Sequence, residues 1–338
     1  MTGRPARLFL CPLLLGLVLL LGACAAPRMP PGPGPSEPRL TADSVITKDG
    51  TELPLRTWLP AGQAPRAVVL ALHGFNDYSN AFEAPGTWLC QQGIAVYAYD
   101  QRGFGEAPHT GLWAGSEQLA EDLATTAALL ARRHPGVPLY LLGESMGGAV
   151  VVAAMTGPAP PAVDGVILSA PAVWSRETMP FYQRGALWLA ARVIPWAKFT
   201  GEGLGVQASD NIEMLRGLGR DPLFIKGTRV VAVDGLTDLM GEALEGGAAL
   251  HTPALVLYGE KDQVVPADPT LRFWRSLPPD ARRLVLYEEG WHLLLRDLQA
   301  AVVLTDIEAW IADPAAPLPS GADLQASEDL ATLVGGAT

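Results

Sequence analysis

The chain has 338 residues, of which 49% are hydrophobic and 17% are charged, and its formal net charge is −11 at pH 7. This composition supplies a large core and excludes an intrinsically disordered protein, and the length fits one large domain with an insertion, or two domains. An acidic chain without a basic run is a poor candidate for binding nucleic acid or for electrostatic docking on anionic lipid.

Residues 1–23 have the features of an export signal. Arg4 and Arg7 precede an apolar run from Leu8 to Leu21, and the sequence "LGAC" follows, ending at Cys24. A positive start, a short apolar stretch and small residues before a cleavage site are typical of a secretory signal rather than a spanning helix. "LGAC" also resembles the lipobox of bacterial lipoproteins, which implies that Cys24 becomes the first mature residue and carries lipid. A plain signal peptide with an incidental cysteine is the alternative.

Residues 24–42 are rich in proline and glycine, which predicts a tether of extended chain and coil between a lipid anchor and the folded domain. The residue after Cys24 is Ala25 rather than Asp, and in this the chain resembles lipoproteins that are sorted to the outer membrane. We therefore expect a lipid-anchored protein of the bacterial envelope, in the outer membrane where the host has one. Cys90 is then the one cysteine of the mature domain, so it has no partner for an internal disulfide.

Short apolar runs alternate with helical patterns from residue 43 onward. The runs are continuous, as expected for parallel strands that are covered on both faces, and comprise residues 66–74, 94–100, 137–145, 163–171, 252–262 and 282–290. Helical patterns cover residues 116–131 and 298–311. This alternation predicts a doubly wound, mostly parallel α/β sheet with helices on both faces, built from residues 43–172 and 236–312.

The stretch between the fourth and fifth runs is too long for one crossover connection. We expect residues 173–235 to form a helical cap over the sheet, with most of its aromatic residues packed on the core. These aromatic residues are Trp174, Phe181, Tyr182, Trp188, Trp196 and Phe199. Residues 313–338 are rich in Ala, Pro, Gly and Ser, which predicts a loosely ordered tail.

The sequence "GESMG", from Gly143 to Gly147, fits the pattern G-x-S-x-G and follows a predicted strand directly. In this context the serine lies on a sharp strand-to-helix turn, where neighbouring side chains would collide and glycines relieve the crowding. Ser145 is therefore the predicted nucleophile.

A serine nucleophile needs a base and an acid that orients the base. Among the five histidines, His292 follows the last predicted strand, and Asp262 follows the strand before it, so both lie at carboxyl ends of strands. His251 precedes its strand, and His109 and His134 precede the serine. The other carboxylates that could replace Asp262 are Glu260, Asp268, Asp234 and Asp238.

An oxyanion formed at the reacting carbonyl needs two donors. We expect the backbone amides of Met146, directly after the nucleophile, and of Phe75, in the loop after the first predicted parallel strand. His73 lies at the end of that strand and is expected to shape the loop. Glu144 is expected to have a structural or pocket-tuning role.

Six motifs in this order resemble the monoglyceride lipase and lysophospholipase branch of the α/β-hydrolases: "LHGFNDYS", "YDQRGFGEA", "GESMGG", "LSAP", "YGEKDQVVP" and "EEGWHLLL". The resemblance runs from about Asp49 to Trp310 and includes "DNIEML" and "DPL" in the cap. It implies a hydrolase with the triad Ser145, Asp262 and His292. The chain departs from the family at Phe104, where a histidine is usual, which affects a loop contact rather than the triad.

The resemblance implies a membrane-tethered serine esterase that cleaves monoacylglycerol-like or lysophospholipid-like esters through an acyl-enzyme, without metal or cofactor. A small-ester esterase on the same triad is one alternative, and a serine aminopeptidase is another. It would need cap carboxylates for a substrate ammonium, and Glu177, Glu202 and Glu213 are available. A binding lipoprotein without turnover is a third reading. A haloalkane dehalogenase or epoxide hydrolase would have Asp in place of Ser145. Oligomeric state, acyl length and head group stay open.

Overall fold

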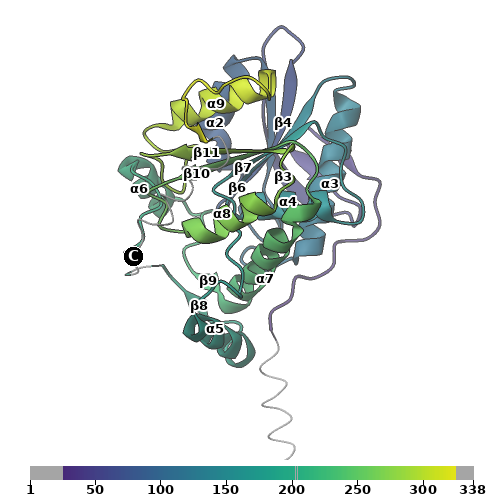
Figure 1. Cartoon of the computed structure of the whole chain (residues 1–338). Coiled ribbons are helices and arrows are strands. Elements are labelled where there is room, and N and C mark those ends of the chain that lie inside the picture. Colours follow the sequence, from purple (N-terminus) through teal and green to yellow (C-terminus); the bar gives the residue numbers. More distant parts are fainter. Residues whose placement is uncertain (1–25, 202, 204, 325–338) are drawn as a thin grey trace, which may run out of the picture.

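A twisted central sheet organises the residues that the computed structural model describes, which are 26–201, 203 and 205–324 (Figure 1). Its strand order is β1-β2-β3-β5-β4-β6-β7-β10-β11-β12, and the six strands that the sequence predicts, β4, β5, β6, β7, β10 and β11, are parallel. Antiparallel strands flank them at both edges. The predicted α/β-hydrolase architecture, with a mostly parallel sheet, is therefore confirmed.

The strands of this sheet are β1 (Arg39–Leu40), β2 (Ser44–Ile46), β3 (Glu52–Trp58), β4 (Ala67–Leu72), β5 (Ile94–Tyr99), β6 (Leu139–Glu144), β7 (Gly165–Ser169), β10 (Ala254–Gly259), β11 (Arg282–Tyr287) and β12 (Asp323–Leu324). The helices are η1 (Ser79–Phe82), α2 (Glu83–Gln91), α3 (Ser116–Arg133), α4 (Met146–Thr156), α5 (Phe181–Val193), α6 (Ile212–Arg220), α7 (Val230–Gly246), η2 (Gly247–Ala249), α8 (Ala267–Ser276) and α9 (Ala300–Ala312). Two short strands, β8 (Lys198–Phe199) and β9 (Thr228–Arg229), pair with each other in the cap.

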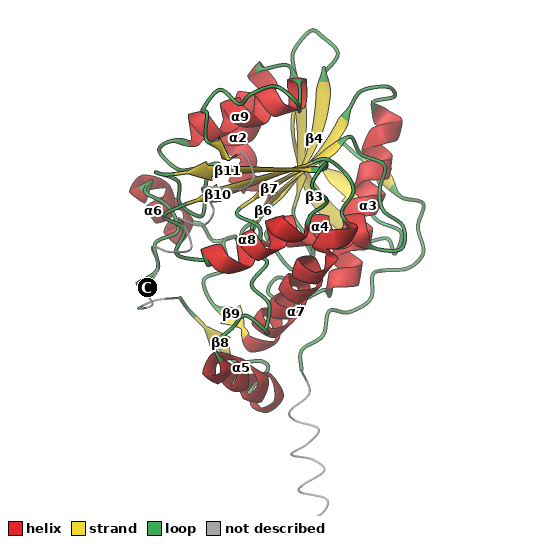
Figure 2. Ribbon diagram, in the orientation of Figure 1, coloured by secondary structure: helices red, strands yellow, loops and turns green. Residues whose placement is uncertain are grey.

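Helices cover both faces of the sheet, as continuous apolar strands require (Figure 2). One core contains side chains of α3, α4, α7 and α8, and the other contains side chains of α2 and α9. The predicted helix over residues 116–131 is α3, which buries Leu119, Leu123 and Leu130. The predicted helix over residues 298–311 is α9 and begins two residues later.

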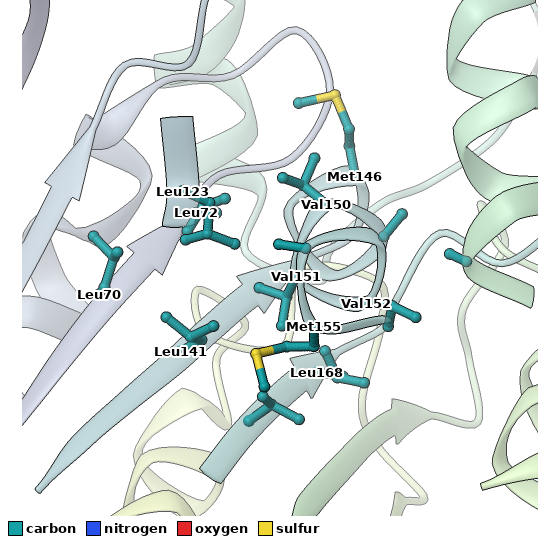
Figure 3. Close-up of a cluster of buried hydrophobic side chains, with 14 of the residues drawn as sticks. Leu70, Leu72, Leu123, Leu141, Met146, Val150, Val151, Val152, Met155 and Leu168 are labelled. Carbon is teal, nitrogen blue, oxygen red and sulfur yellow. The ribbon is translucent and has the colours of Figure 1, made fainter. Parts of the chain in front are cut away.

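Helix α4, which follows the predicted nucleophile, buries nine of its 11 residues, and Figure 3 shows several of their side chains beside those of β4, β6 and β7. Val150 and Val151 are fully buried with Leu141 and Leu168 in the same cluster, and α3 and α7 cover the outer side of the helix. A helix that is apolar all round is stable only when it is buried in this way. The serine that precedes α4 is thus attached to a helix that is almost wholly buried in the core.

The cap lies between β7 and α7 and contains α5, α6, β8 and β9. Helix α7 crosses the predicted cap boundary at residue 235, because it runs without a break from Val230 and packs against both α4 of the core and α5 of the cap. The expectation that most cap aromatics pack on the core is wrong. Phe181, Tyr182, Trp188, Trp196 and Phe199 are between 44% and 78% exposed.

Both terminal predictions need correction where the structure describes the chain. The predicted tether is not free over its second half, because the amides of Gly34 and Ser36 bond to the carbonyls of Asp49 and Lys48, and β1 pairs with β2. The predicted loose tail is wrong for residues 313–324. There Leu318 is 4% exposed, β12 pairs with β11, and Asp323 forms an ion pair with Arg283.

The predicted signal peptide, Cys24 and residues 325–338 lie outside the described residues. In the part that the structure describes, no helix is both long enough and apolar enough to cross a membrane.

Candidate active site

Ser145 occupies a single-residue turn between β6 and α4. Its backbone has φ 54° and ψ −116°, a left-handed conformation that side-chain-bearing residues rarely adopt. The turn is fixed on both sides, because the Ser145 amide donates to the Ser169 carbonyl at 2.9 Å and its carbonyl accepts from Ala172 at 3.0 Å. The strain therefore persists in the folded state and presents the hydroxyl at the carboxyl edge of the sheet.

The two glycines of the motif allow this turn. A Cβ atom on Gly143 would lie 2.4 Å from the Gly148 nitrogen, and one on Gly147 would lie 2.1 Å from the Leu72 carbonyl oxygen. Both distances are shorter than any van der Waals contact, so only glycine fits while α4 stays this close to β4 and β6.

His292 and Asp262 meet above the carboxyl ends of β10 and β11. The His292 Nδ1 atom lies 2.8 Å from Asp262 Oδ2, and both side chains are almost fully buried. Asp262 Oδ1 accepts the amides of Val264 at 2.7 Å and Val265 at 3.0 Å, which fixes the carboxylate. This arrangement leaves Nε2 as the nitrogen for proton transfer.

The other residues considered for the triad are either paired elsewhere or exposed, and Asp268 and His109 are among the exposed ones. Asp234 and Asp238 both pair with Arg176, while Glu260 and His251 are exposed. His134 bonds to the Tyr97 hydroxyl at the end of α3.

The electrostatics of His292 combine burial with a strong counter-charge. Burial favours the neutral imidazole and lowers its pKa, but the charge and hydrogen bond of Asp262 outweigh burial and raise the pKa above the ordinary 6.5. Glu144 adds to this rise, and Arg296 opposes it. An imidazole whose protonated form is stabilised by a neighbouring carboxylate is suited to take a proton from a hydroxyl and to return it.

The loop from His73 to Asp77 lies against the nucleophile. A Cβ atom on Gly74 would be 3.4 Å from the Ser145 Cβ atom. In the described residues, the amides of Phe75 and Met146 have no hydrogen-bond acceptor within the protein. Both are therefore available to an oxyanion at Ser145.

His73 has the loop-shaping place that its position predicts. It is fully buried, its Nε2 accepts the Gln101 amide at 3.0 Å, and its Nδ1 lies 2.8 Å from the Gly74 carbonyl oxygen. Burial lowers its pKa, so it is the neutral Nδ1–H tautomer that donates to Gly74. Phe104, the departure from the usual histidine, packs edge-on against both His73 and Phe75, and so replaces a polar loop contact with an apolar one.

Arg296 is the residue that sequence reasoning missed. Its Nη2 atom lies 2.7 Å from Glu144 Oε1 and 2.8 Å from Asp77 Oδ2, and all three residues are at most 8% exposed. Burial lowers the pKa of the guanidinium, but the two carboxylates raise it above its ordinary value, so Arg296 stays charged. The cluster joins three segments: Glu144, which directly precedes Ser145, the loop from His73 to Asp77, which we name the oxyanion loop, and the segment after His292.

A cavity of about 730 Å³ opens above Ser145 and His292. Its walls come from the core and the cap and are mostly apolar: Phe75, Ala172, Trp174, Met179, Leu187, Ala208, Leu215, Leu218, Phe224, Val233, Leu236, Met240, Val264, Val265 and Leu293. A strained serine, a buried histidine–aspartate pair and two free amides beside an apolar cavity can together carry out acyl transfer.

Comparisons with known proteins agree with this geometry. The sequence profile of the family described as "Serine aminopeptidase, S33" matches residues 63–299. A monoacylglycerol lipase of Mycolicibacterium smegmatis is 25% identical over 265 residues, which cover 78% of this chain and 93% of that protein. The monoglyceride lipase of Rattus norvegicus is 25% identical over 297 residues, which cover 82% and 95%.

The fold is shared with a soluble variant of the Saccharomyces cerevisiae monoglyceride lipase in complex with a substrate analogue. That structure matches with a TM-score of 0.68 and 21% sequence identity, over 83% of this chain and 98% of its own.

Asp262 sets the pH dependence of the site. We expect the rate at which a fluorophosphonate labels Ser145 to fall as pH drops through a midpoint above 6.5, because protonated His292 cannot act as a base. Asp262→Asn removes the charge that raises this pKa, so the midpoint moves to lower pH and the rate falls by about 10⁴-fold. Glu260→Gln is the matched control and leaves both quantities unchanged. An equal loss of labelling rate in Asp262→Asn and Glu260→Gln would rule out Asp262 as the orienting acid.

Arg296 supports both stability and the electrostatics of His292. Arg296→Gln leaves two buried carboxylates unpaired and is expected to lower the free energy of unfolding by about 3–5 kcal/mol, measured by urea denaturation. It also moves the midpoint of the labelling rate to higher pH, because Arg296 opposes the rise in the His292 pKa.

Arg296→Lys keeps the charge and should restore the midpoint. Arg176, which also pairs with two aspartates but is 28% exposed, provides the control Arg176→Gln. That variant should lower the free energy of unfolding by less than about 1 kcal/mol and leave the pH midpoint of the labelling rate unchanged. A midpoint that stays in place in a folded Arg296→Gln protein would limit Arg296 to a structural role.

Proposed function

The chain belongs to the serine aminopeptidase, S33, family of α/β-hydrolases, and from this membership we propose that it is a membrane-tethered serine esterase that cleaves monoacylglycerol-like or lysophospholipid-like esters. The two curated relatives are each 25% identical to this chain. The proposal therefore rests on the cavity above Ser145.

The proposed reaction has two halves. The Ser145 hydroxyl attacks the ester carbonyl while His292 Nε2 takes its proton, and the amides of Phe75 and Met146 stabilise the oxyanion of the tetrahedral intermediate. His292 then gives its proton to the leaving alcohol, which departs and leaves the acyl group on Ser145. Water attacks this acyl-enzyme with His292 again as the base, and the second collapse releases a carboxylic acid and restores Ser145.

The charge balance of the cavity wall is the observation that carries the proposed substrate class. Two carboxylates line the cavity in the described part of the chain, Asp77 and Glu144, and both are paired with Arg296. The rest of the wall is dominated by aliphatic and aromatic side chains. Such a surface suits an acyl chain, whose burial is favourable by about 0.8 kcal/mol for each methylene group. The names of the two curated relatives and of the yeast structure, all monoglyceride lipases, support the same class.

The same observation disfavours an aminopeptidase. Glu177 is 73% exposed and lies 3.9 Å from Arg272, and Glu213 pairs with Arg216 on the surface of α6. Neither lines the cavity. Glu202 lies outside the described residues. A substrate ammonium would therefore enter a largely apolar cavity, in which Asp77 and Glu144 are already paired with Arg296.

A substrate panel tests this proposal. We expect hydrolysis of monoacylglycerols and lysophospholipids to exceed that of aminoacyl amides by at least about 10²-fold in kcat/KM, because burying an unpaired ammonium costs several kcal/mol. Ser145→Ala should abolish hydrolysis while the unfolding transition stays in place. A preference for aminoacyl amides would refute the esterase assignment, and full activity in Ser145→Ala would refute the mechanism. A wild-type protein that neither hydrolyses the panel nor reacts with a fluorophosphonate would indicate a binding protein.

The proposed tether begins at Cys24. Lipid on this residue would hold the domain at the envelope membrane, in the outer membrane where the host has one. We expect the wild-type chain to incorporate labelled palmitate and to fractionate with membranes, and Cys24→Ala to lose the label. Cys90→Ala is the control, since Cys90 lies in α2 of the folded domain. Equal palmitate incorporation in wild type and Cys24→Ala would contradict lipidation at this cysteine.

A further inference from the structure

The outer face of the cap exposes apolar side chains to an unusual extent. None of the 13 residues of α5 is buried. Leu187 lines the cavity from the inner side of this helix, whereas the outward side chains and those of the segment that follows are exposed. We define the cap face as the exposed residues Phe181 (78%), Tyr182 (62%), Trp188 (52%), Leu189 (55%), Val193 (53%), Trp196 (44%) and Phe199 (58%). A helix with apolar side chains on both its inner and its outer side leaves the outer ones in water unless another apolar surface covers them.

The composition of the cap face suits the interface between lipid and water. It combines Trp and Tyr, whose rings have an apolar body and a polar tip, with Phe, Leu and Val. Helices that lie in the plane of a membrane surface have this kind of face, with basic residues beside it.

The charged residues within the segment that carries the cap face are of one sign. Residues 181–200 contain Arg184, Arg192 and Lys198 and no acidic residue, although the whole chain has a net charge of −11. All three are exposed, and the Arg192 guanidinium lies 4.2 Å from the centre of the Trp188 ring. The average charge argues against docking on anionic lipid, but the local charge of the cap face favours contact with lipid phosphates.

The described N-terminal end lies at the cap end of the molecule (Figure 1). A Cβ atom on Gly103 would lie 3.3 Å from the Met29 methyl carbon, and the Gly103 carbonyl accepts the Gly111 amide. The Gly111 carbonyl in turn accepts from Arg229, at 2.7 Å. Arg229 belongs to β9, which pairs with β8 in the cap. Met29 is therefore three contacts away from the cap, with Gly103 and Gly111 between them.

Chain length then limits where a lipid anchor can lie. Cys24 precedes Met29 by five residues, and a fully extended chain of that length spans at most about 18 Å. An acyl chain on Cys24 would hold the bilayer on the cap side of the protein. This step rests on the proposed lipidation, whereas the exposure and charge of the cap face do not.

We propose that the cap face is a docking surface for a phospholipid bilayer, which turns α5 and the cavity beneath it toward the membrane. The cap aromatics enter the interfacial region, and the three basic side chains contact lipid phosphates. Because Leu187 of the same helix lines the cavity, docking would bring the roof of the cavity to the lipid from which an acyl substrate leaves.

Quenching of tryptophan fluorescence tests this orientation. The full chain is reconstituted into phosphatidylcholine–phosphatidylglycerol vesicles that contain lipids brominated on the acyl chain. Trp188 and Trp196 are the reporters, and we expect their fluorescence to be quenched in the wild-type protein. The Phe181→Ser/Leu189→Ser variant keeps both tryptophans and should lose at least half of this quenching. Trp188→Phe/Trp196→Phe should lose a similar share because the reporters are gone. Trp88→Phe, on α2 in the other core, is the control and retains the quenching.

Separate readouts distinguish the possible failures. Flotation with the vesicles reports the anchor, and hydrolysis of a soluble short-chain ester reports the proposed activity, which Phe181→Ser/Leu189→Ser should leave unchanged. The docking proposal would be overturned if the wild-type protein floats with the vesicles but its fluorescence is quenched no more than that of the Phe181→Ser/Leu189→Ser variant. A dimer in detergent that Phe181→Ser/Leu189→Ser dissociates would overturn it too, and would assign the cap face to a second copy of the chain.

Discussion

The backbone strain at Ser145 is the constraint on which the site depends. Holding a residue with a side chain at φ 54° costs free energy of about 1–3 kcal/mol, and the surrounding core must supply it. Helix α4 does so because it is apolar on every side and lies between the sheet and two other helices. The same packing excludes any side chain at Gly143 and Gly147. The predicted nucleophile is thus positioned by helix burial together with the backbone hydrogen bonds of Ser145 to Ser169 and Ala172.

The segments around the nucleophile are joined by charge. Arg296 connects the residue before Ser145 with the oxyanion loop and lies four residues after His292. The cap also contacts that loop, because the Ile225 amide donates to the Asn76 carbonyl at 2.9 Å and the Asn76 side chain donates to Thr228. The oxyanion loop is therefore fixed from below by a buried ion cluster and from above by polar contacts, so its amides do not need to reorganise during the reaction.

Strand order explains why much of the site could be predicted. Ser145, Asp262 and His292 each follow a continuous apolar run, and carboxyl ends of parallel strands meet at one edge of a sheet. Arg296 had only an indirect signal, which was a charged residue within the apolar segment "LLLRDL" and a glutamate beside the nucleophile. A buried ion pair between residues 152 positions apart cannot be read from periodicity. The outward direction of the cap aromatics was missed for a related reason, since hydrophobicity alone does not say which medium covers a side chain.

The cap and the core differ in how firmly they are held. Helices α5 and α6 have no buried residue, whereas α4 has nine and α7 has seven. Because burial of apolar surface is the main source of local stability, the roof of the cavity opens at lower free energy than its floor. An acyl chain bound beneath α5, or lipid in contact with its outer side, would bury surface that the free protein leaves in water. Any such contact stabilises the ordered cap by mass action and leaves the geometry of Ser145, Asp262 and His292 unchanged, since these residues are held by the core.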